Sequence, residues 1–170
     1  TGEYAEDEDD EVMGPQDHDV NLQPDPDTIS IVPWYDEPTA QVIVDCFNQD
    51  GSPVEIASRY VLKRVLQLYD DRGWKPVIAP ELEFFLVQVN TDPDLPLLPP
   101  IGRSGRPETG RQSYGIDAVN EFDPIFEDVY DFCEKQEIDI DTLTHESGSA
   151  QMEINFNHGD PLALADQAFV

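Results

Sequence analysis

The chain has 170 residues, of which 37 are acidic and 9 are basic, so its formal net charge is −28 at pH 7. This charge argues against partners that need a basic surface, such as nucleic acids and anionic membranes. With 39% hydrophobic residues the chain can bury a core, and no run approaches the ~20 apolar residues of a membrane span. Cys46 and Cys133 lack the spacing of a metal site and predict reduced thiols in a cytoplasmic protein, with one disulfide as the alternative.

The first part of the chain predicts an acidic tail followed by a small β unit. Residues 1–27 are rich in Asp, Glu and Pro, and the run EDEDDEV (Glu6–Val12) is typical of a solvated segment. TISIV (28–32) and AQVIVDCF (Ala40–Phe47) predict two strands, separated by a turn at Pro33–Pro38. The turn residues of NQDGSP end this unit.

The middle of the chain predicts two helices and a long strand. Apolar residues at helical spacing, among them Val61, Val65 and Leu68, predict a helix over about residues 54–71. The run KPVIAPELEFFLVQV (75–89) predicts a central strand. A second helix is predicted over about residues 117–136, with an inward face of Val119, Phe122, Phe126, Val129, Tyr130 and Cys133.

Between these elements, residues 91–113 predict a long loop, because they contain several Pro, Gly and Arg residues and no periodicity. Loops of this length are uncommon unless they are functional or mobile. Arg103, Arg106 and Arg111 would suit a loop that covers a site, although a simple solvent loop is the more economical expectation.

The last third predicts two strands, IDIDTLTHES (138–147) and SAQMEINFNH (149–158), joined by a turn at Gly148, and then a helix from Pro161. This order of elements predicts an α/β or α+β domain preceded by the end of a small β unit, with the boundary between residues 52 and 53. The chain starts at Thr1 without Met and ends within a helical pattern, so we expect it to be part of a longer protein.

Two glutamates lie in the most hydrophobic strand, PELEFFLV (80–87). Side chains at i and i+2 share one face of a strand, about 7 Å apart. Glu81 and Glu83 therefore face one way, and Leu82, Phe84 and Leu86 face the other. Like charges on an apolar strand are unfavourable unless a cation compensates them or the face is wet, so both interpretations remain open for this pair alone.

A second pair of glutamates strengthens the cation interpretation. In QMEINF, Met152, Ile154 and Phe156 form the apolar face, so Glu153 points the other way. If the last two strands form a hairpin, Glu146 approaches Glu153. Four glutamates would then converge on one face, and oxygen-only ligands suit Mg²⁺ or Mn²⁺.

These segments together resemble the glutamine synthetase superfamily, most closely its γ-glutamylpolyamine synthetase-like (glutamate–putrescine ligase-like) branch. PELEFFLV is similar to the family's E-x-E-F strand, and HESGSAQMEINF to the segment with two further metal-binding glutamates. LQPDPDTISIVPW and AQVIVDCF resemble the end of its N-terminal β-grasp domain, and GSPVEIASRYVLKRVL the first helix of its catalytic domain. The resemblance implies an α+β fold: the end of a β-grasp domain (1–52), then the first part of a catalytic domain with an antiparallel sheet and helices (53–170).

The resemblance also implies the roles of individual residues. Glu83, Glu146 and Glu153 match the three carboxylates of one metal site, and Glu81 matches a ligand of a second. The other ligands of that second site, a His and a Glu, come from later sequence in the family, so we expect the 170 residues alone to be inactive. His158 lies near a position that lines the nucleotide site, although a lone His is more often structural or at the surface, and this holds for His18 and His145 too.

The implied function is an ATP-dependent ligase that forms a γ-glutamyl amide from glutamate and ammonia or a polyamine, through γ-glutamyl phosphate. Mg²⁺ or Mn²⁺ would be the cofactor, and the family assembles as double hexameric rings. Two alternatives from other classes are a two-carboxylate glycoside hydrolase and a non-catalytic acidic module that binds divalent cations. Neither has its expected signals, which are aromatic platforms beside the glutamates and an EF-hand loop.

Overall fold

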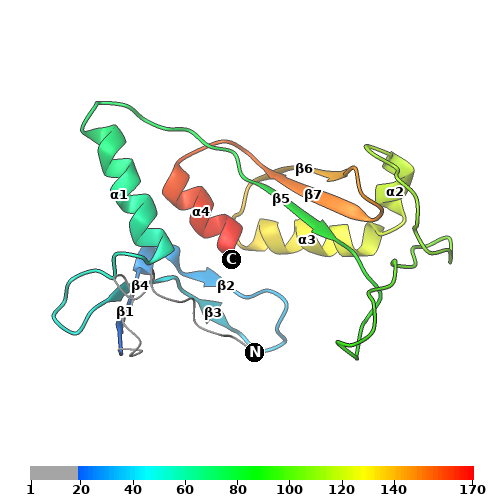
Figure 1. The fold of residues 1–170 in the computed structure, drawn as a ribbon, viewed down its shortest axis with the longest axis horizontal. Helices are drawn as coiled ribbons and strands as arrows, with labels where there is room; N and C mark the ends of the chain where they lie inside the picture. Colours follow the sequence, from blue (N-terminus) through cyan, green and yellow to red (C-terminus); the bar gives the residue numbers. More distant parts are fainter. Residues whose placement is uncertain (1–18) are drawn as a thin grey trace. The chain divides into compact units, whose positions relative to one another are not determined.

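A computed structural model describes residues 19–170 of the chain, so the predicted acidic run at Glu6–Val12 and His18 lie outside the described residues. Figure 1 shows the order of the elements along the chain. The strands are β1 (Asn21–Pro24), β2 (Ser30–Ile31), β3 (Ala40–Gln41), β4 (Val44–Phe47), β5 (Glu81–Phe85), β6 (Ile140–His145) and β7 (Gln151–Phe156). The helices are the 3-10 helix η2 (Pro26–Thr28), α1 (Ser58–Asp70), α2 (Ile116–Asn120), α3 (Asp123–Lys135) and α4 (Pro161–Phe169).

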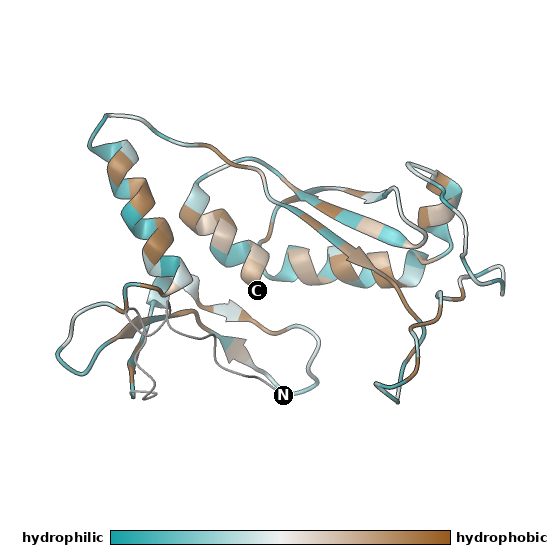
Figure 2. Cartoon of the chain, in the orientation of Figure 1, coloured by the Kyte–Doolittle hydropathy of each residue, from teal (hydrophilic) through white to brown (hydrophobic). Residues whose placement is uncertain are grey.

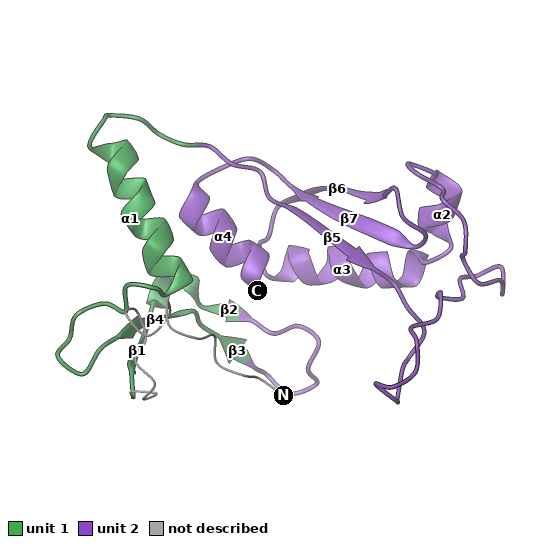
Figure 3. Ribbon diagram, in the orientation of Figure 1, with its two compact units in different colours: residues 1–30, 40–76 green, residues 31–39, 77–170 purple. Residues whose placement is uncertain are grey.

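The chain forms two compact units, coloured separately in Figure 3. The described part of the first unit spans residues 19–30 and 40–76, and the second spans residues 31–39 and 77–170. The predicted domain boundary between residues 52 and 53 stays a prediction. Among the described residues, no helix combines the length and the apolar character needed to cross a bilayer.

In the first unit an ion-pair network joins helix α1 to the antiparallel pair β1–β4. Arg59 of α1 contacts the Asp25 carboxylate at 2.7 Å and the Asp45 carboxylate at 2.8 Å. Lys63, one turn further along, contacts Asp45 at 2.7 Å. The Arg59 guanidinium holds the pKa of Asp25 below its usual value. The pKa of Asp45 is also lowered, because bonds to Lys63 and Arg59 outweigh its partial burial, which acts the other way.

The predicted strand at Ala40–Phe47 is divided in the structure, because Ile43 bonds to the turn at η2 instead of continuing one ladder. The Ile43 backbone N–H donates to Thr28 Oγ1 at 2.9 Å, and its carbonyl accepts from the Asp25 N–H. As a result β3 pairs with β2, and β4 pairs with β1. Strand β1 lies in the acidic, proline-containing residues 1–27, where the sequence pattern predicted no strand.

The second unit is built on a three-stranded antiparallel sheet in the order β5–β7–β6. Its core lies between one face of this sheet and the first residues of α3, which runs along the sheet in Figure 1. Buried Phe122, Phe126 and Met152 form the cluster, and partly buried Phe84 and Leu86 of the β5 segment pack on it. The predicted apolar faces are therefore confirmed at Phe84, Leu86 and Met152, whereas Leu82, predicted to share the face, is 38% exposed.

The predicted helix over residues 117–136 is interrupted at Phe122, between α2 and α3. Pro124 has no backbone N–H and its ring clashes with the preceding turn, so a helix can begin at this point but cannot run through it. Tyr130, predicted to face inward, is 44% exposed. The strand predicted over residues 75–89 is limited to Glu81–Phe85, because Pro76 and Pro80 supply no ladder donors.

Helix α1 forms close to where its spacing predicts it, but no residue of α1 is buried in the described part of the chain. Figure 2 shows hydrophobic bands alternating with hydrophilic ones along this helix. Val61, Val65 and Leu68 all belong to the exposed hydrophobic residues. The helical spacing of the apolar residues predicts the helix. Whether these residues become buried depends on what packs against them.

Candidate functional site

Two glutamates face each other across neighbouring strands of the second unit. In the register of β5 and β7, Glu83 lies directly opposite Glu153. Directly opposed residues in an antiparallel pair have Cβ atoms about 4.5–5.5 Å apart and side chains on the same face. The backbone therefore places these two carboxylates side by side on one face of the sheet.

The other two predicted glutamates lie on the same face. Strands β6 and β7 form the predicted hairpin, with Thr144 opposite Glu153, so Glu146 shares the face of Thr144 two residues along. The Glu146 backbone N–H donates to the carbonyl of Gln151 at 2.7 Å, which extends the pairing past the strand end. Glu81 lies opposite Asn155 at the other end of the pair. One face of three adjacent strands thus carries all four glutamates.

The carboxylates of these four glutamates do not meet at one point in the structure. Among residues 19–170, no group of three or more His, Cys, Asp or Glu side chains is placed to hold one ion. The Glu83 carboxylate instead accepts a hydrogen bond from Gln151 Nε2 at 2.6 Å. Glu81 and Glu83 are exposed and Glu146 is half-buried, so three of the four can change rotamer without disturbing the core.

The donor set fits a hard divalent cation. Glu153 is 8% exposed, and its carboxylate has no hydrogen-bond or ion-pair partner in the described part of the chain. A buried carboxylate is costly unless a charge compensates it. The hydroxyl of Thr144, directly opposite, is inaccessible to solvent and has no partner among the described residues. Oxygen donors of this kind suit Mg²⁺ or Mn²⁺.

A buried pair fixes the hairpin that carries Glu146 and Glu153. His145 is fully buried; its Nδ1 donates to the carbonyl of Glu146 at 2.8 Å, and its Nε2 lies 2.6 Å from Glu108 Oε1. The same carboxylate oxygen accepts from the Ala150 N–H at 2.6 Å, and the Glu108 carbonyl accepts from the Ser149 hydroxyl. Because His145 is enclosed in this way, its role is structural, as expected for a lone histidine.

Glu108 was not predicted from the sequence, because it lies in the arginine-rich loop and nothing local marks it. That loop is anchored to the hairpin. Arg111 Nε donates to the carbonyl of Ser147 at 2.9 Å, in addition to the bonds that Glu108 makes. Arg103 lies 3.6 Å from Asp123 at the start of α3. Two of the three arginines considered for a covering role therefore bind elements of their own unit.

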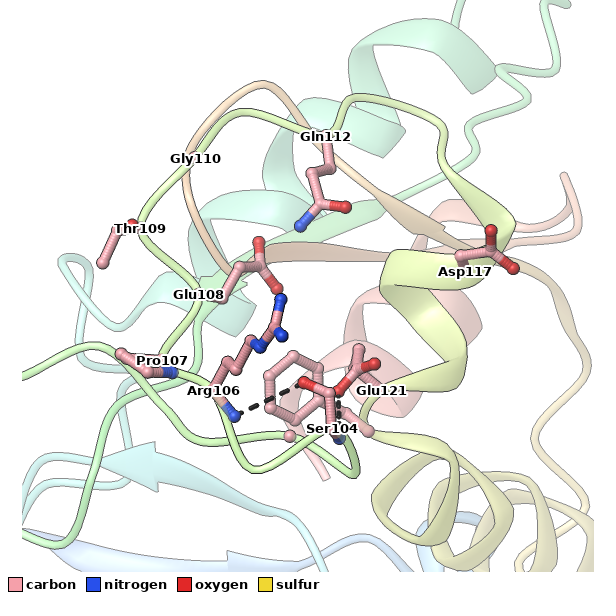
Figure 4. A pocket seen from close by; sticks show the side chains of 11 residues that line it. Ser104, Arg106, Pro107, Glu108, Thr109, Gly110, Gln112, Asp117 and Glu121 are labelled. Atoms are coloured by element: carbon pink, nitrogen blue, oxygen red, sulfur yellow. Dashed lines mark hydrogen bonds between the residues drawn. The ribbon is translucent and has the colours of Figure 1, made fainter.

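The loop also encloses a pocket of about 310 Å³ with α2, shown in Figure 4. Its charged lining includes Arg106, Glu108, Asp117 and Glu121. A hydrogen bond from the Ser104 backbone N–H holds the pKa of Glu121 below its usual value. Glu108 Oε2 is buried there and has no partner within the described residues. The pocket thus holds both signs of charge beside the Glu108–His145 pair.

The remaining candidates are two cysteines and His158. His158 is exposed, two residues after the end of β7, and the next residue, Gly159, forms a bridge with Ile78. Cys46 and Cys133 are both free, as predicted for reduced thiols. Burial raises the pKa of the Cys133 thiol, which keeps it protonated and unreactive near neutral pH.

The family of this chain follows from its match to a known sequence profile. The sequence profile described as "Glutamine synthetase, catalytic domain" matches residues 55–170, more than half of the chain. The chain belongs to the glutamine synthetase family. The antiparallel sheet and helices of the second unit agree with this assignment, which confirms the predicted α+β class. Membership in this family leaves no support for the glycoside hydrolase alternative.

The chain is similar to several kinds of ligase within this family. The glutamine synthetase of Thermotoga maritima is 28% identical over 159 residues, covering 90% of this chain and 34% of that protein. Gamma-glutamylputrescine synthetase PuuA of Escherichia coli is 34% identical, covering 71% and 26%. A glutamate–isopropylamine ligase of a Pseudomonas species is 30% identical, covering 88% and 32%. The chain thus spans between about a quarter and a third of the length of these curated relatives.

A solved structure supports the fold. The structure titled "Apo GmaS without ligand" superposes with a TM-score of 0.72 at 24% identity, covering 92% of this chain and 35% of that one. At this identity the likeness concerns the fold alone. The described chain therefore shares the fold of the corresponding third of that protein.

Proposed function

We propose that the complete protein is an ATP-dependent ligase that joins the γ-carboxyl group of glutamate to ammonia or an amine. The observation that carries the proposal is the set of four glutamates on one sheet face, with Glu83 opposite Glu153, in a chain of this family. The relatives of this chain include both glutamine synthetases and ligases for larger amines. The acceptor is accordingly ammonia or an alkylamine such as a polyamine.

The reaction has two steps that balance. An oxygen of the glutamate γ-carboxylate bonds to the γ-phosphorus of ATP, and the bond to the bridging oxygen breaks, which releases ADP and forms γ-glutamyl phosphate. The amine nitrogen then bonds to the acyl carbon, phosphate leaves, and the nitrogen loses a proton. Phosphoryl transfer of this kind depends on positioning and on stabilising negative charge more than on covalent catalysis.

The protein residues supply the positioning in this proposal. Glu83, Glu146 and Glu153 would hold one Mg²⁺ or Mn²⁺, and Glu81 would contribute to a second. When bound, such ions neutralise the phosphate and carboxylate charges and so stabilise the transferred phosphoryl group. The rigid ladder between β5 and β7 fixes the spacing of Glu83 and Glu153, and the buried His145 fixes the hairpin behind Glu146. His158 is proposed to line the nucleotide site, and the assembly to be a double hexameric ring.

An assay on the complete protein tests the proposal. Phosphate release from ATP should require glutamate together with ammonia, putrescine or isopropylamine, and the most effective amine identifies the acceptor. Glu153→Gln should abolish the release, whereas Glu127→Gln on the exposed side of α3 should leave it unchanged. Phosphate release that does not depend on glutamate with any amine would contradict the ligase.

A further inference from the structure

The side chain of Gln151 joins the Glu83 carboxylate to the turn between β6 and β7. Its Nε2 donates to Glu83 Oε2 at 2.6 Å, and its Oε1 accepts from the Gly148 backbone N–H at 2.7 Å. Its backbone carbonyl accepts from the Glu146 N–H at 2.7 Å. One residue at the start of β7 therefore contacts both the strand of Glu83 and the hairpin arm of Glu146.

The chemistry of its two neighbours fixes the orientation of the Gln151 amide. A backbone N–H only donates, so it must face the amide oxygen. An ionised carboxylate only accepts, so it must face the amide NH₂ group. Glutamine satisfies both contacts at once. Neither a glutamate nor an apolar residue of the same length would do so.

Gly148 leaves the room that this amide occupies. A Cβ atom added at Gly148 would lie 2.8 Å from Gln151 Oε1 and 2.7 Å from Phe85 Cε1. Both distances are shorter than ordinary contacts, so any larger residue would displace the amide or the ring. The glycine predicted as a simple turn residue thus allows the Gln151 side chain to pack closely against the turn.

We propose that Gln151 is a positioning residue of the carboxylate site, acting through Glu83. Its amide holds the Glu83 carboxylate on the face shared with Glu153 and ties that carboxylate to the turn behind Glu146. This inference rests on the proposed metal site and adds to it a residue that binds no ion itself. Outer partners that orient metal-binding carboxylates typically change metal affinity by about 10–100-fold when they are removed.

The test measures Mn²⁺ binding to the complete protein by calorimetry. Gln151→Met keeps the length of the side chain and removes both amide contacts, and should weaken Mn²⁺ binding by about 10–100-fold. Gln88→Met is the matched control, because the Gln88 amide also donates one hydrogen bond, in this case to the backbone carbonyl of Pro99 at 2.8 Å. The control should bind Mn²⁺ as the unmodified protein does.

A double-mutant cycle separates positioning from a general structural effect. If Gln151 acts through Glu83, adding Gln151→Met to Glu83→Gln should weaken Mn²⁺ binding no further. Unchanged affinity in Gln151→Met, or the same loss with and without Glu83, would overturn the inference. If Glu83→Gln itself binds Mn²⁺ normally, the proposed metal site fails and the positioning role fails with it.

A second measurement does not depend on how the Gln151 variant folds. In the unmodified protein, the NMR signals of the Gln151 side-chain amide should move when Mg²⁺ is added, because Glu83 changes partners or geometry. The same titration of Glu83→Gln should leave these signals in place. Signals that do not respond to Mg²⁺ in the unmodified protein would overturn the inference.

Discussion

The carboxylate of Glu108 lies 2.6 Å from the imidazole of His145, and both side chains are buried although 37 positions separate them in the sequence. Glu108 belongs to an irregular loop and His145 ends strand β6. The contact therefore ties the loop to the hairpin that presents Glu146 and Glu153. A connection of this kind makes the geometry of the carboxylate face depend on a segment that contributes no carboxylate to it.

Glu108→Ala should lower the free energy of unfolding by about 3 kcal/mol, because it leaves the buried Nε2 of His145 without its partner and the Ala150 N–H without its acceptor. Urea denaturation followed by circular dichroism measures this loss. Glu127→Ala, on the exposed side of α3, is the control and should change stability by less than about 0.5 kcal/mol. Equal stability of the two variants would show that the pair does not support the hairpin.

Met152→Ala should lower the free energy of unfolding by about 2–5 kcal/mol, since Met152 is fully buried against Phe122 and Phe126. The comparison variant is Val89→Ala, whose side chain is 93% exposed and should lose almost nothing on truncation. Thermal unfolding of both variants provides the measurement. If Met152→Ala changed the free energy of unfolding only slightly, the core could not lie between the sheet and α3.

The first unit should lose stability in acid through its ion-pair network. Arg59 and Lys63 lower the pKa values of Asp25 and Asp45, whose ordinary value is 3.8. A carboxylate with a lowered pKa stabilises the folded state above its unfolded pKa, and this contribution is lost as pH falls through the folded pKa. Amide exchange in β1 and β4 should therefore speed up when pH falls below about 3.8, after correction for the intrinsic exchange rate.

Arg59→Met provides the control for that titration. Without the guanidinium, Asp25 loses its main partner and Asp45 loses one of its two cationic partners, so the first unit should already be less protected near pH 6 and should show a smaller further loss in acid. The sheet β5–β7–β6 of the second unit serves as the internal reference, because it contains neither Asp25 nor Asp45. An identical acid response with and without Arg59 would contradict the role of the network.

Much of the site could be predicted because a strand has a strict period of two. Alternation alone placed Glu81 and Glu83 on one face of their strand, and Glu153 opposite the apolar face of Met152 and Phe156. The short turn at Gly148 made a hairpin between the last two strands the natural hypothesis, and β6 and β7 do pair antiparallel. The register that sets Glu83 directly against Glu153 could not be predicted this way, because β5 and β7 are separated by two helices and a long loop.

Most of what could not be predicted depends on contacts between residues that are distant in the sequence. Glu108 looks like any charged loop residue until the fold brings it to His145. Strand β1 has polar and proline residues, and it becomes a strand only by pairing with β4. The break between α2 and α3 could have been predicted, because Pro124 is typical of the first turn of a helix. It was missed because the apolar residues keep their helical spacing through Phe122.

The most direct test of the account is Mn²⁺ binding by calorimetry to the unmodified protein, Glu83→Gln, Glu153→Gln and the exposed control Glu127→Gln. If Glu83 and Glu153 form one cation site, each of the first two variants should bind Mn²⁺ about tenfold more weakly or worse, and the control should match the unmodified protein. Equal affinity in all four proteins would contradict the metal site and the proposed function built on it.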